Sequence, residues 1–125
     1  MRGVRKIVLL AGFLALVSGA SYAQMSAFGP WGLPLTSHDL KEMGKAVQPL
    51  LTDDSIPIGT TNQWSNSASG NHGSVQLLER FETQYEGNNL PCRKIRYHIE
   101  VKGNADPYNV VLDRCKVADG SWKIL

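Results

Sequence analysis

The chain has 125 residues, with 13 Lys and Arg against 11 Asp and Glu, so its formal net charge is +2. The first 23 residues hold three of the basic side chains and no acidic one, so the remainder has 10 basic and 11 acidic groups, a charge of −1. A near-neutral domain lacks the basic surface that binds nucleic acid, so we expect no nucleic-acid partner. Hydrophobic residues make up 42% of the chain, which favours a folded domain over a disordered one.

Residues 1–23 have the three-part pattern of a secretory signal peptide. A basic start over 1–6 precedes 11 apolar residues over 7–17, and small residues then lead to Ala23. Eleven helical residues span about 17 Å, well short of a ~30 Å hydrocarbon core, which disfavours a membrane anchor. We therefore expect cleavage after Ala23 and no transmembrane span afterwards. The mature chain is expected in a periplasmic or secreted space, with association to the outer membrane as a further alternative.

The two cysteines, Cys92 and Cys115, are the only ones in the chain. Two such thiols pair in an oxidising compartment. They do not form a Cys-x-x-Cys motif, and the histidines form neither His-x-His nor His-Glu-x-x-His, which disfavours zinc and thiol-redox sites. We predict one disulfide, no metal site and no cofactor.

Residues 24–35 contain two glycines and two prolines, a composition that predicts an extended segment ahead of the domain. The same segment also carries Phe28, Trp31 and two leucines. We expect Trp31 to dock on the domain or on a partner, so that the segment is not a free tail. A single domain is expected over 36–125.

A helix is predicted over about 37–48. Thr36, followed three residues later by Asp39, is a helix start related to the capping box. Pro49 is expected to end or kink the helix near Gln48. The apolar residues that follow the start recur at helical spacing: Leu40, Met43, Val47 and Leu50.

After residue 51 the sequence changes from helical spacing to alternation. A short strand is expected over 60–64, and a polar loop follows over 65–73. Strands then alternate with turns near 86–89, 103–104 and 119–120. A helix followed by hairpin-connected strands predicts an α+β fold, with one N-terminal helix packed on a mostly antiparallel sheet of four to five strands.

A two-residue turn at Gly103 and Asn104 predicts a register in which facing residue numbers sum to 207. Three apolar pairs, one charge pair and the cysteines agree on it: Ile95 with Leu112, Tyr97 with Val110, Ile99 with Tyr108, Lys94 with Asp113, and Cys92 with Cys115. Directly opposed strand residues lie within disulfide reach. Pro107 cannot donate to the ladder, so a longer loop over 102–106 is the alternative.

Asp119 and Gly120 are a second two-residue turn signal. Facing numbers would then sum to 239, which places Trp122 and Ile124 on the cysteine side of the sheet. Both faces would carry apolar residues. Either the helix covers one face and the preceding segment covers the other, or a bulge moves the following side chains to the opposite face. The sequence leaves open which face the helix covers.

The motifs from residue 64 onward resemble those of a known family. The pattern W-x-N-x-x-S-G-x-x-G-x-V runs from Trp64 to Val75, Pro-Cys-Arg covers 91–93, and Asp-Gly-x-Trp covers 119–122. This combination is similar to the C-terminal domain of the 17-kilodalton surface antigen family of Gram-negative bacterial envelopes, over about 36–125. The resemblance implies an envelope protein and supplies no catalytic residue. The lipid-attachment cysteine and glycine zipper typical of that family have no counterpart in this sequence.

Two groups of polar residues are candidate binding sites. The first lies in the loop over 65–73 and comprises Ser65, Asn66, Ser69, Asn71 and His72. The loop lacks the lysine of a phosphate loop and no helix follows it, so we favour a structural connection in which Gly70 and Gly73 take positive φ.

The second group is the facing pair Arg93 and Arg114, whose numbers also sum to 207. Two facing guanidiniums repel unless an anion or a carboxylate lies between them. An anion site is one interpretation. We favour the other, in which the side chains splay apart or pair with Glu79, Asp119 or the chain terminus.

The sequence leaves three hypotheses for function. The first is an exported non-enzymatic envelope protein, a small binding or structural module whose partner is an envelope protein or a cell-wall component. The second is a cell-wall or small-substrate hydrolase with His72 and a nearby acid as general base. The third is a protease-inhibitor-like module that uses the loop over 65–73. His72 within hydrogen-bonding distance of an acid inside a concave pocket would favour the second.

Overall fold

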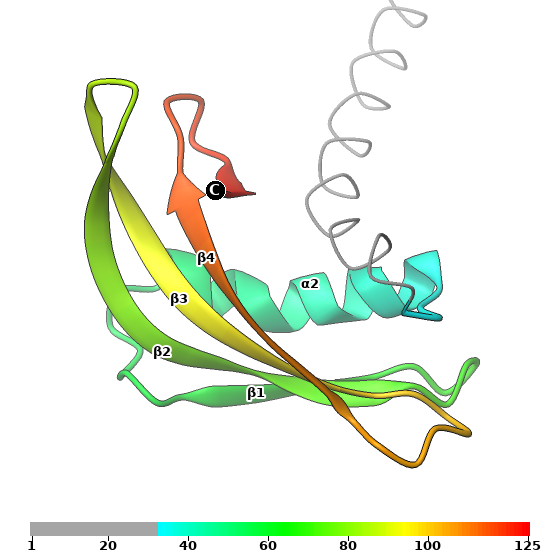
Figure 1. Ribbon diagram of the computed structural model, residues 1–125. Coiled ribbons are helices and arrows are strands. Elements are labelled where there is room, and N and C mark those ends of the chain that lie inside the picture. The colour runs from blue at the N-terminus through cyan, green and yellow to red at the C-terminus, as the bar shows by residue number, and fades with distance from the viewer. Residues whose placement is uncertain (1–32) are drawn as a thin grey trace, which may run out of the picture.

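The computed structural model describes residues 33–125, so the predicted signal peptide, the predicted cleavage site and Trp31 lie outside the described residues. One helix, α2 (Ser37–Thr52), packs on one face of an antiparallel sheet with the strand order β1-β2-β3-β4-β5 (Figure 1). The strands are β1 (Thr61–Ser65), β2 (His72–Tyr85), β3 (Asn88–Glu100), β4 (Tyr108–Lys116) and β5 (Trp122–Ile124). The predicted α+β fold is confirmed. Among residues 33–125, no helix has the length and apolar composition needed to cross a bilayer.

The start of α2 is the predicted one. The Thr36 hydroxyl accepts a hydrogen bond from the Asp39 N–H at 3.0 Å, and the Asp39 carboxylate accepts one from the Thr36 N–H at 2.8 Å. These two bonds form a complete capping box and satisfy two backbone donors that the helix itself leaves without acceptors.

The end of α2 differs from the prediction, because the helix continues through Pro49 to Thr52. Proline removes one helical hydrogen bond, but Leu50 and Leu51 just after it are buried to 0% and 1% exposure. Burying a leucine side chain contributes about 2 kcal/mol, so the two leucines together outweigh the lost bond. Tertiary packing therefore sets this helix end, and the predicted end near Gln48 was wrong, whereas the alternative of a kink at that point stays a prediction.

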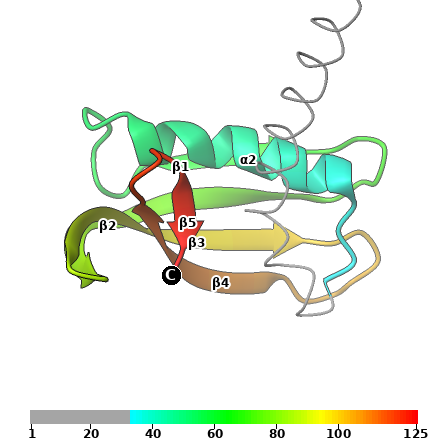
Figure 2. The ribbon, with the colours of Figure 1, turned by 90° about the horizontal axis from the view of Figure 1, so that it is seen from above.

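The helix covers the face of the sheet that carries Ile95, Tyr97 and Ile99. These three side chains are fully buried, and they belong to one cluster with Met43 and Val47 of α2. Viewed from above, α2 runs along the β1–β2 side of the sheet (Figure 2). The sequence had left the covered face open, and the structure settles it.

The register between β3 and β4 is the predicted one, since Ile95 faces Leu112, Cys92 faces Cys115 and all recorded pairs sum to 207. The predicted two-residue turn is wrong. Strand β3 ends at Glu100 and β4 begins at Tyr108, so the connection is the longer alternative. Pro107 directly precedes β4 and has no N–H to donate, which ends the ladder at that point.

The register between β4 and β5 differs by one from the prediction, because Arg114 faces Ile124 and Lys116 faces Trp122, pairs that sum to 238. The Gly120 N–H donates to the Val117 carbonyl at 2.9 Å, and Gly120 takes φ +88°. This is a three-residue loop with a left-handed glycine, which adds one residue to the predicted turn. Trp122 therefore lies on the helix-covered face, and it packs against the main core.

A β-bulge between Leu77 and Glu79 shifts the register of β2 against β3. Such a bulge bends the strand and increases its twist. Beyond it, β2 and β3 curve away and continue past the helix as a long hairpin (Figure 1). A second, smaller cluster lies on the opposite face of this bent part and contains Leu90 and the two cysteines, with Phe81 and Val117 packed against them.

Candidate functional site

The polar loop after β1 is organised around a buried carboxylate on the helix. Asp39 is fully buried, and three loop side chains donate hydrogen bonds to it. The donors and distances are Asn66 Nδ2 at 2.8 Å, Ser69 Oγ at 2.6 Å and Asn71 Nδ2 at 2.8 Å. Together with the Thr36 N–H, these bonds satisfy both carboxylate oxygens. The helix start and the loop are therefore one polar network.

The ionisation of Asp39 follows from these contacts. Burial acts to raise the pKa of this carboxyl, but the hydrogen bonds from Ser69, the Thr36 backbone, Asn71 and Asn66 together lower the pKa to about 2. The carboxylate therefore stays charged at neutral pH. Its role is structural, because all of its contacts are with the chain's own donors.

Two glycines allow the loop to close. Gly70 takes φ +79°, as the sequence predicted. Gly73 does not take positive φ and lies in β2, where a Cβ would lie 2.0 Å from the His98 carbonyl oxygen and 3.0 Å from Trp64 Nε1. The glycine is thus required for close strand packing, which corrects the expectation for this residue. The residues of the W-x-N-x-x-S-G-x-x-G pattern all have structural contacts.

Of the five candidate binding residues of the loop, three donate their side-chain hydrogen bonds to Asp39: Asn66, Ser69 and Asn71. Asn71 also accepts a hydrogen bond from the Lys102 N–H at 2.9 Å, which ties the loop to the β3–β4 connection. Ser65 and His72 remain exposed at the ends of β1 and β2. The predicted site thus divides into an internal network and two surface residues.

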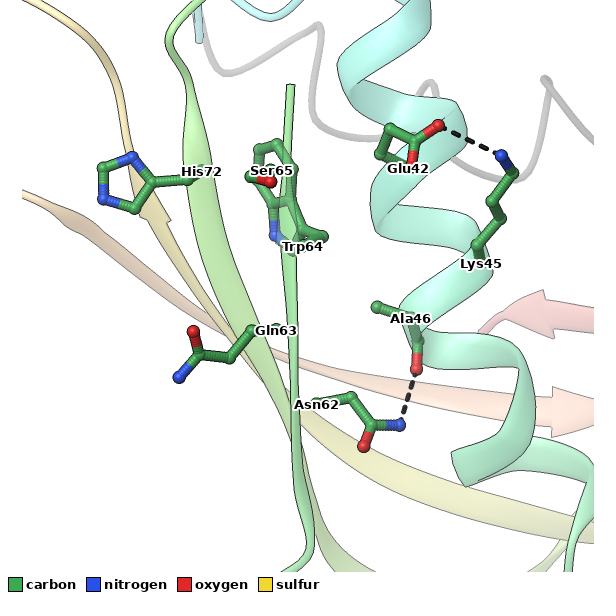
Figure 3. A pocket seen from close by; sticks show the side chains of 8 residues that line it. All are labelled: Glu42, Lys45, Ala46, Asn62, Gln63, Trp64, Ser65 and His72. Carbon is green, nitrogen blue, oxygen red and sulfur yellow. Dashed lines mark hydrogen bonds and ion pairs between the residues drawn. The ribbon is translucent and has the colours of Figure 1, made fainter. Parts of the chain in front are cut away.

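The two surface residues border a groove of about 650 Å³ that runs between α2 and β1. Its other lining residues are Glu42, Lys45 and Ala46 of the helix and Asn62, Gln63 and Trp64 of the strand. Figure 3 shows Asn62 pointing across the groove, where its side-chain amide donates to the Ala46 carbonyl at 3.0 Å. On the helix side, the Glu42 carboxylate pairs with Lys45 at 3.1 Å.

His72 lies within reach of an acid, as the hydrolase hypothesis required. Its Nε2 is 2.9 Å from Glu100 Oε2, and the two side chains are 54% and 48% exposed. In Figure 3 the imidazole points away from α2, and Glu100 does not line the groove. His72 itself borders the groove, so the pair is an exposed contact between β2 and β3 at the rim of the groove, with Glu100 outside it.

His98 extends this surface contact without forming a metal site. Its Nε2 is 4.0 Å from the same Glu100 oxygen, and its Nδ1 is 2.9 Å from Asn109 Oδ1. Over the part of the chain that the structure describes, no three or more His, Cys, Asp or Glu side chains are placed to hold a metal ion.

Arg93 has a carboxylate partner, as the favoured interpretation required, although the acid is a different one. Its Nη2 donates to Asp54 Oδ1 at 2.8 Å, its Nη1 donates to the Cys92 carbonyl at 2.9 Å, and the guanidinium lies 5.1 Å from the Trp122 ring centre. Asp54 follows α2, so this pair ties the bent part of the sheet to the segment after the helix.

Arg114 and Arg80 flank Arg93 on the neighbouring strands, so three guanidiniums form a row on the helix-covered face. Arg114 donates to the Tyr97 hydroxyl at 3.0 Å and to the Trp122 carbonyl at 3.2 Å. Arg80 donates to the carbonyls of Ile56 and Asp53 at 2.6 and 3.2 Å. Acceptors of the chain itself therefore bind all three guanidiniums. The sequence analysis missed Arg80 because the bulge between Leu77 and Glu79 moves the Arg80 side chain to the helix-covered face.

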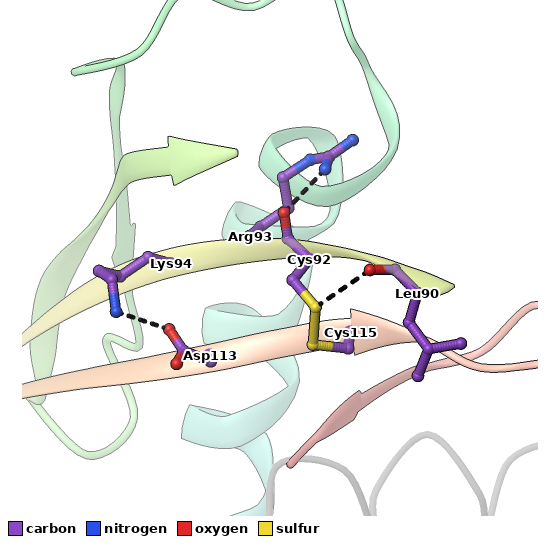
Figure 4. The surroundings of a disulfide bond; sticks show 6 residues. All are labelled: Leu90, Cys92, Arg93, Lys94, Asp113 and Cys115. Atoms are coloured by element: carbon purple, nitrogen blue, oxygen red, sulfur yellow. Dashed lines mark hydrogen bonds and ion pairs between the residues drawn. A yellow bond between two sulfur atoms is a disulfide. The ribbon is translucent and has the colours of Figure 1, made fainter. Parts of the chain in front are cut away.

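The disulfide between Cys92 and Cys115 is confirmed, with a Cα–Cα distance of 4.1 Å. Figure 4 shows it on the side of β3 opposite to Arg93. Lys94 donates to Asp113 at 2.9 Å beside it, and its ammonium lies 5.6 Å from the Phe81 ring centre. The bond joins β3 to β4 where the two strands run beyond the helix.

Strand β1 is an edge of the sheet, and within residues 33–125 no strand pairs with its outer side. The Thr60 carbonyl accepts from the Leu77 N–H at 3.0 Å, and the Asn66 N–H donates to the Asn71 carbonyl at 2.9 Å. Backbone groups alternate sides along a strand, so the groups of even-numbered residues face β2. The N–H and C=O groups of Thr61, Gln63 and Ser65 therefore face away from the sheet.

Comparison of the chain with protein-family models, with curated proteins and with solved structures found no match. The groove, the open edge of β1 and the surface pair of His72 with Glu100 are therefore the features from which a function has to be argued.

Proposed function

We propose that the mature chain is an exported, non-enzymatic protein of a bacterial envelope and acts as a small binding or structural module in the periplasm or at the outer membrane. The signal-peptide pattern of residues 1–23 supports export. The paired cysteines suit an oxidising compartment. The motif resemblance to the 17-kilodalton surface antigen family supports the envelope as the place of action.

The observation that carries the proposal is the open edge of β1 beside the groove. Free N–H and C=O groups at a sheet edge recognise an extended backbone by adding it as a further strand. The groove then receives side chains of the added strand, between β1 and Glu42 or Lys45 of α2. The partner is therefore an envelope protein that offers an extended segment.

A hydrolase is the second candidate, and one observation favours it. The 2.9 Å contact between His72 and Glu100 would orient an imidazole as a general base. Both side chains are half exposed, so water competes for the contact and the site has no enclosed place for a substrate. Loss of a measurable hydrolytic activity in His72→Ala, with the fold intact, would favour this candidate. The inhibitor-like alternative has less support, because the loop amides face Asp39.

Site-specific photo-crosslinking in the producing cell tests the proposal. A photoreactive residue at Gln63 is expected to form crosslinks to an envelope protein in the exported fraction. The same residue at Val111, which is 48% exposed and lies on β4, is the control and should crosslink less. Crosslinks to glycan alone would mean a cell-wall partner at this edge. Retention in the cytoplasm, or equal crosslinking at the two positions, would contradict the proposal.

A further inference from the structure

The two edges of the sheet differ in how they are protected. Natural edge strands avoid pairing with other chains by being charged, by containing proline or by being covered. Strand β5 has three residues and contains Lys123. Strand β1 has the sequence Thr-Asn-Gln-Trp-Ser, with neither charge nor proline, and no described strand pairs with its outer side. The edge of β1 is therefore suited to pairing with another strand.

We propose that this edge pairs with β1 of a second copy of the chain, antiparallel, about a two-fold axis through Gln63. The inference rests on the proposed function, because it names the partner for the same groove. The backbone groups of Thr61, Gln63 and Ser65 face away from the sheet, and this symmetric set can pair with the same three residues of a second copy. Gln63 then lies opposite Gln63 of the second copy, and Thr61 lies opposite Ser65. Each of these is a hydrogen-bonded pair, so all outward N–H and C=O groups of β1 find partners.

The position of α2 allows this pairing. The helix contacts β1 and β2 about equally. An axis midway between these two strands would lie about half a strand spacing inside β1. Strands are about 4.8 Å apart, which places each helix axis about 5 Å from the two-fold axis and the two helices about 10 Å apart. Packed helices lie 8–10 Å apart, so the helices of the two copies would meet without clashing.

The helix side that faces the open edge is complementary to itself in charge and in size. It presents Glu42, Lys45 and Ala46 to the groove. Asn62 bonds to the Ala46 backbone, so Gln63 lies level with the turn of helix between residues 42 and 46. An antiparallel copy then brings Lys45 opposite Glu42 of the first chain, and the small Ala46 leaves room for the contact. A second copy therefore fits the groove by pairing and by charge.

Cysteine crosslinking tests the register directly. In the purified protein, Gln63→Cys places two thiols opposite each other at about 5.5 Å between Cα atoms, so oxidation is expected to give a covalent dimer. Ser65→Cys is the matched control, because its two copies would lie about 14 Å apart along the strands and should stay unlinked. Equal crosslinking of the two variants, or none in Gln63→Cys, would overturn the proposed pairing.

Sedimentation equilibrium tests the backbone contact. Gln63→Ala keeps the outward N–H and should associate like the natural chain, whereas Gln63→Pro lacks it and should weaken association at least tenfold. A natural chain that stays monomeric up to about 1 mM would overturn the inference. So would a folded Gln63→Pro variant that associates as well as Gln63→Ala. If Gln63→Pro does not fold, the comparison of Gln63→Cys with Ser65→Cys decides whether the proposed pairing exists.

The two proposals fail in different ways. Crosslinks from Gln63 to another envelope protein, with a monomeric purified chain, would overturn the second-copy partner and leave the binding function intact. Absence of any crosslink at Gln63, in the cell and in the purified protein, would overturn both.

Discussion

Where α2 covers the sheet, the strands are held by an apolar core and by one buried carboxylate, whereas the strands that run past the helix are held by a disulfide and by arginines. Met43 and Tyr97 represent the first region, and both are fully buried. Cys92 and Arg93 represent the second region, where the covalent bond lies on one face and the guanidinium on the other. The chain changes its means of stabilisation where the helix ends.

The difference teaches how a domain of this size can extend a hairpin beyond its core. A small domain buries only a limited share of its surface, so a strand pair without a covering layer lacks apolar stabilisation. The disulfide compensates by constraining the unfolded chain. Substitutions in the two regions should therefore differ in how far they lower the free energy of unfolding and in which amides they expose to exchange.

The largest effect is expected in the helix-covered region. Asp39→Ala leaves the side-chain donors of Asn66, Ser69 and Asn71 without their acceptor, and each buried unsatisfied group costs about 1–3 kcal/mol. We expect the free energy of unfolding in urea to fall by about 4 kcal/mol. Asp119→Ala is the control, because this carboxylate is exposed and bonds only locally to Ser121. Equal effects of the two substitutions would contradict the network.

Loss of the disulfide is expected to rank second. Cys92→Ser with Cys115→Ser removes a link across 23 residues of sequence, which the chain-entropy model values at about 3 kcal/mol. Amide exchange should then accelerate in the bent hairpin first, while the amides around Tyr97 keep their protection. Uniform acceleration over the whole sheet would show that the two regions do not differ as described.

Acid should weaken the helix-covered region selectively. The folded pKa of Asp39, about 2, lies below the ordinary value of 3.8, so its contribution is complete above pH 4 and is lost as the pH falls toward 2. The difference corresponds to about 2 kcal/mol. Urea unfolding of the natural chain at pH 5 and pH 2 should show this loss, and Asp39→Asn should lack it. An identical pH dependence of both proteins would contradict the assignment.

The smallest effect is expected from Arg93→Lys. Lysine keeps the charge near Asp54 but cannot donate in parallel to the Cys92 carbonyl or lie flat on Trp122, so a loss of about 1 kcal/mol is expected. The melting temperature should fall by a few degrees, about 4–8 °C per kcal/mol in a domain of this size. A loss as large as that of the disulfide would mean that the arginine row, and not the covalent bond, holds the bent hairpin.

Much of the fold follows from local signals in the sequence. Three predicted features depend on residues close in sequence or on a single strand pair. They are the capping box at Thr36, the alternation of apolar and polar residues in the strands, and the register between β3 and β4. The cysteines and Lys94 with Asp113 agree on that register, so the disulfide was predictable as well. The helix end beyond Pro49 was not predictable, because it depends on packing between distant segments. The face of Trp122 was missed because the turn at Gly120 holds one residue more than the sequence signal indicated.

The candidate site was less predictable for the same reason. Asn66, Ser69 and Asn71 were candidate binding residues in a loop for which we favoured a structural role. No local pattern shows that their side chains turn toward Asp39, about 30 residues earlier. The open edge of β1 was also hidden, because the order of strands in a sheet is a tertiary property. The absence of charge and proline in β1 is the one sequence signal that pointed to it.

Residue-resolved amide exchange at several protein concentrations tests the open edge of β1 most directly. In dilute protein the Gln63 N–H should exchange fast while the N–H groups of Asn62 and Trp64, which face β2, stay protected. In concentrated protein the Gln63 N–H should become protected as the second copy pairs with it, and in Gln63→Ala the amide at this position should behave in the same way. Fast exchange at position 63 at every concentration, or equal protection in dilute and concentrated protein, would contradict the account.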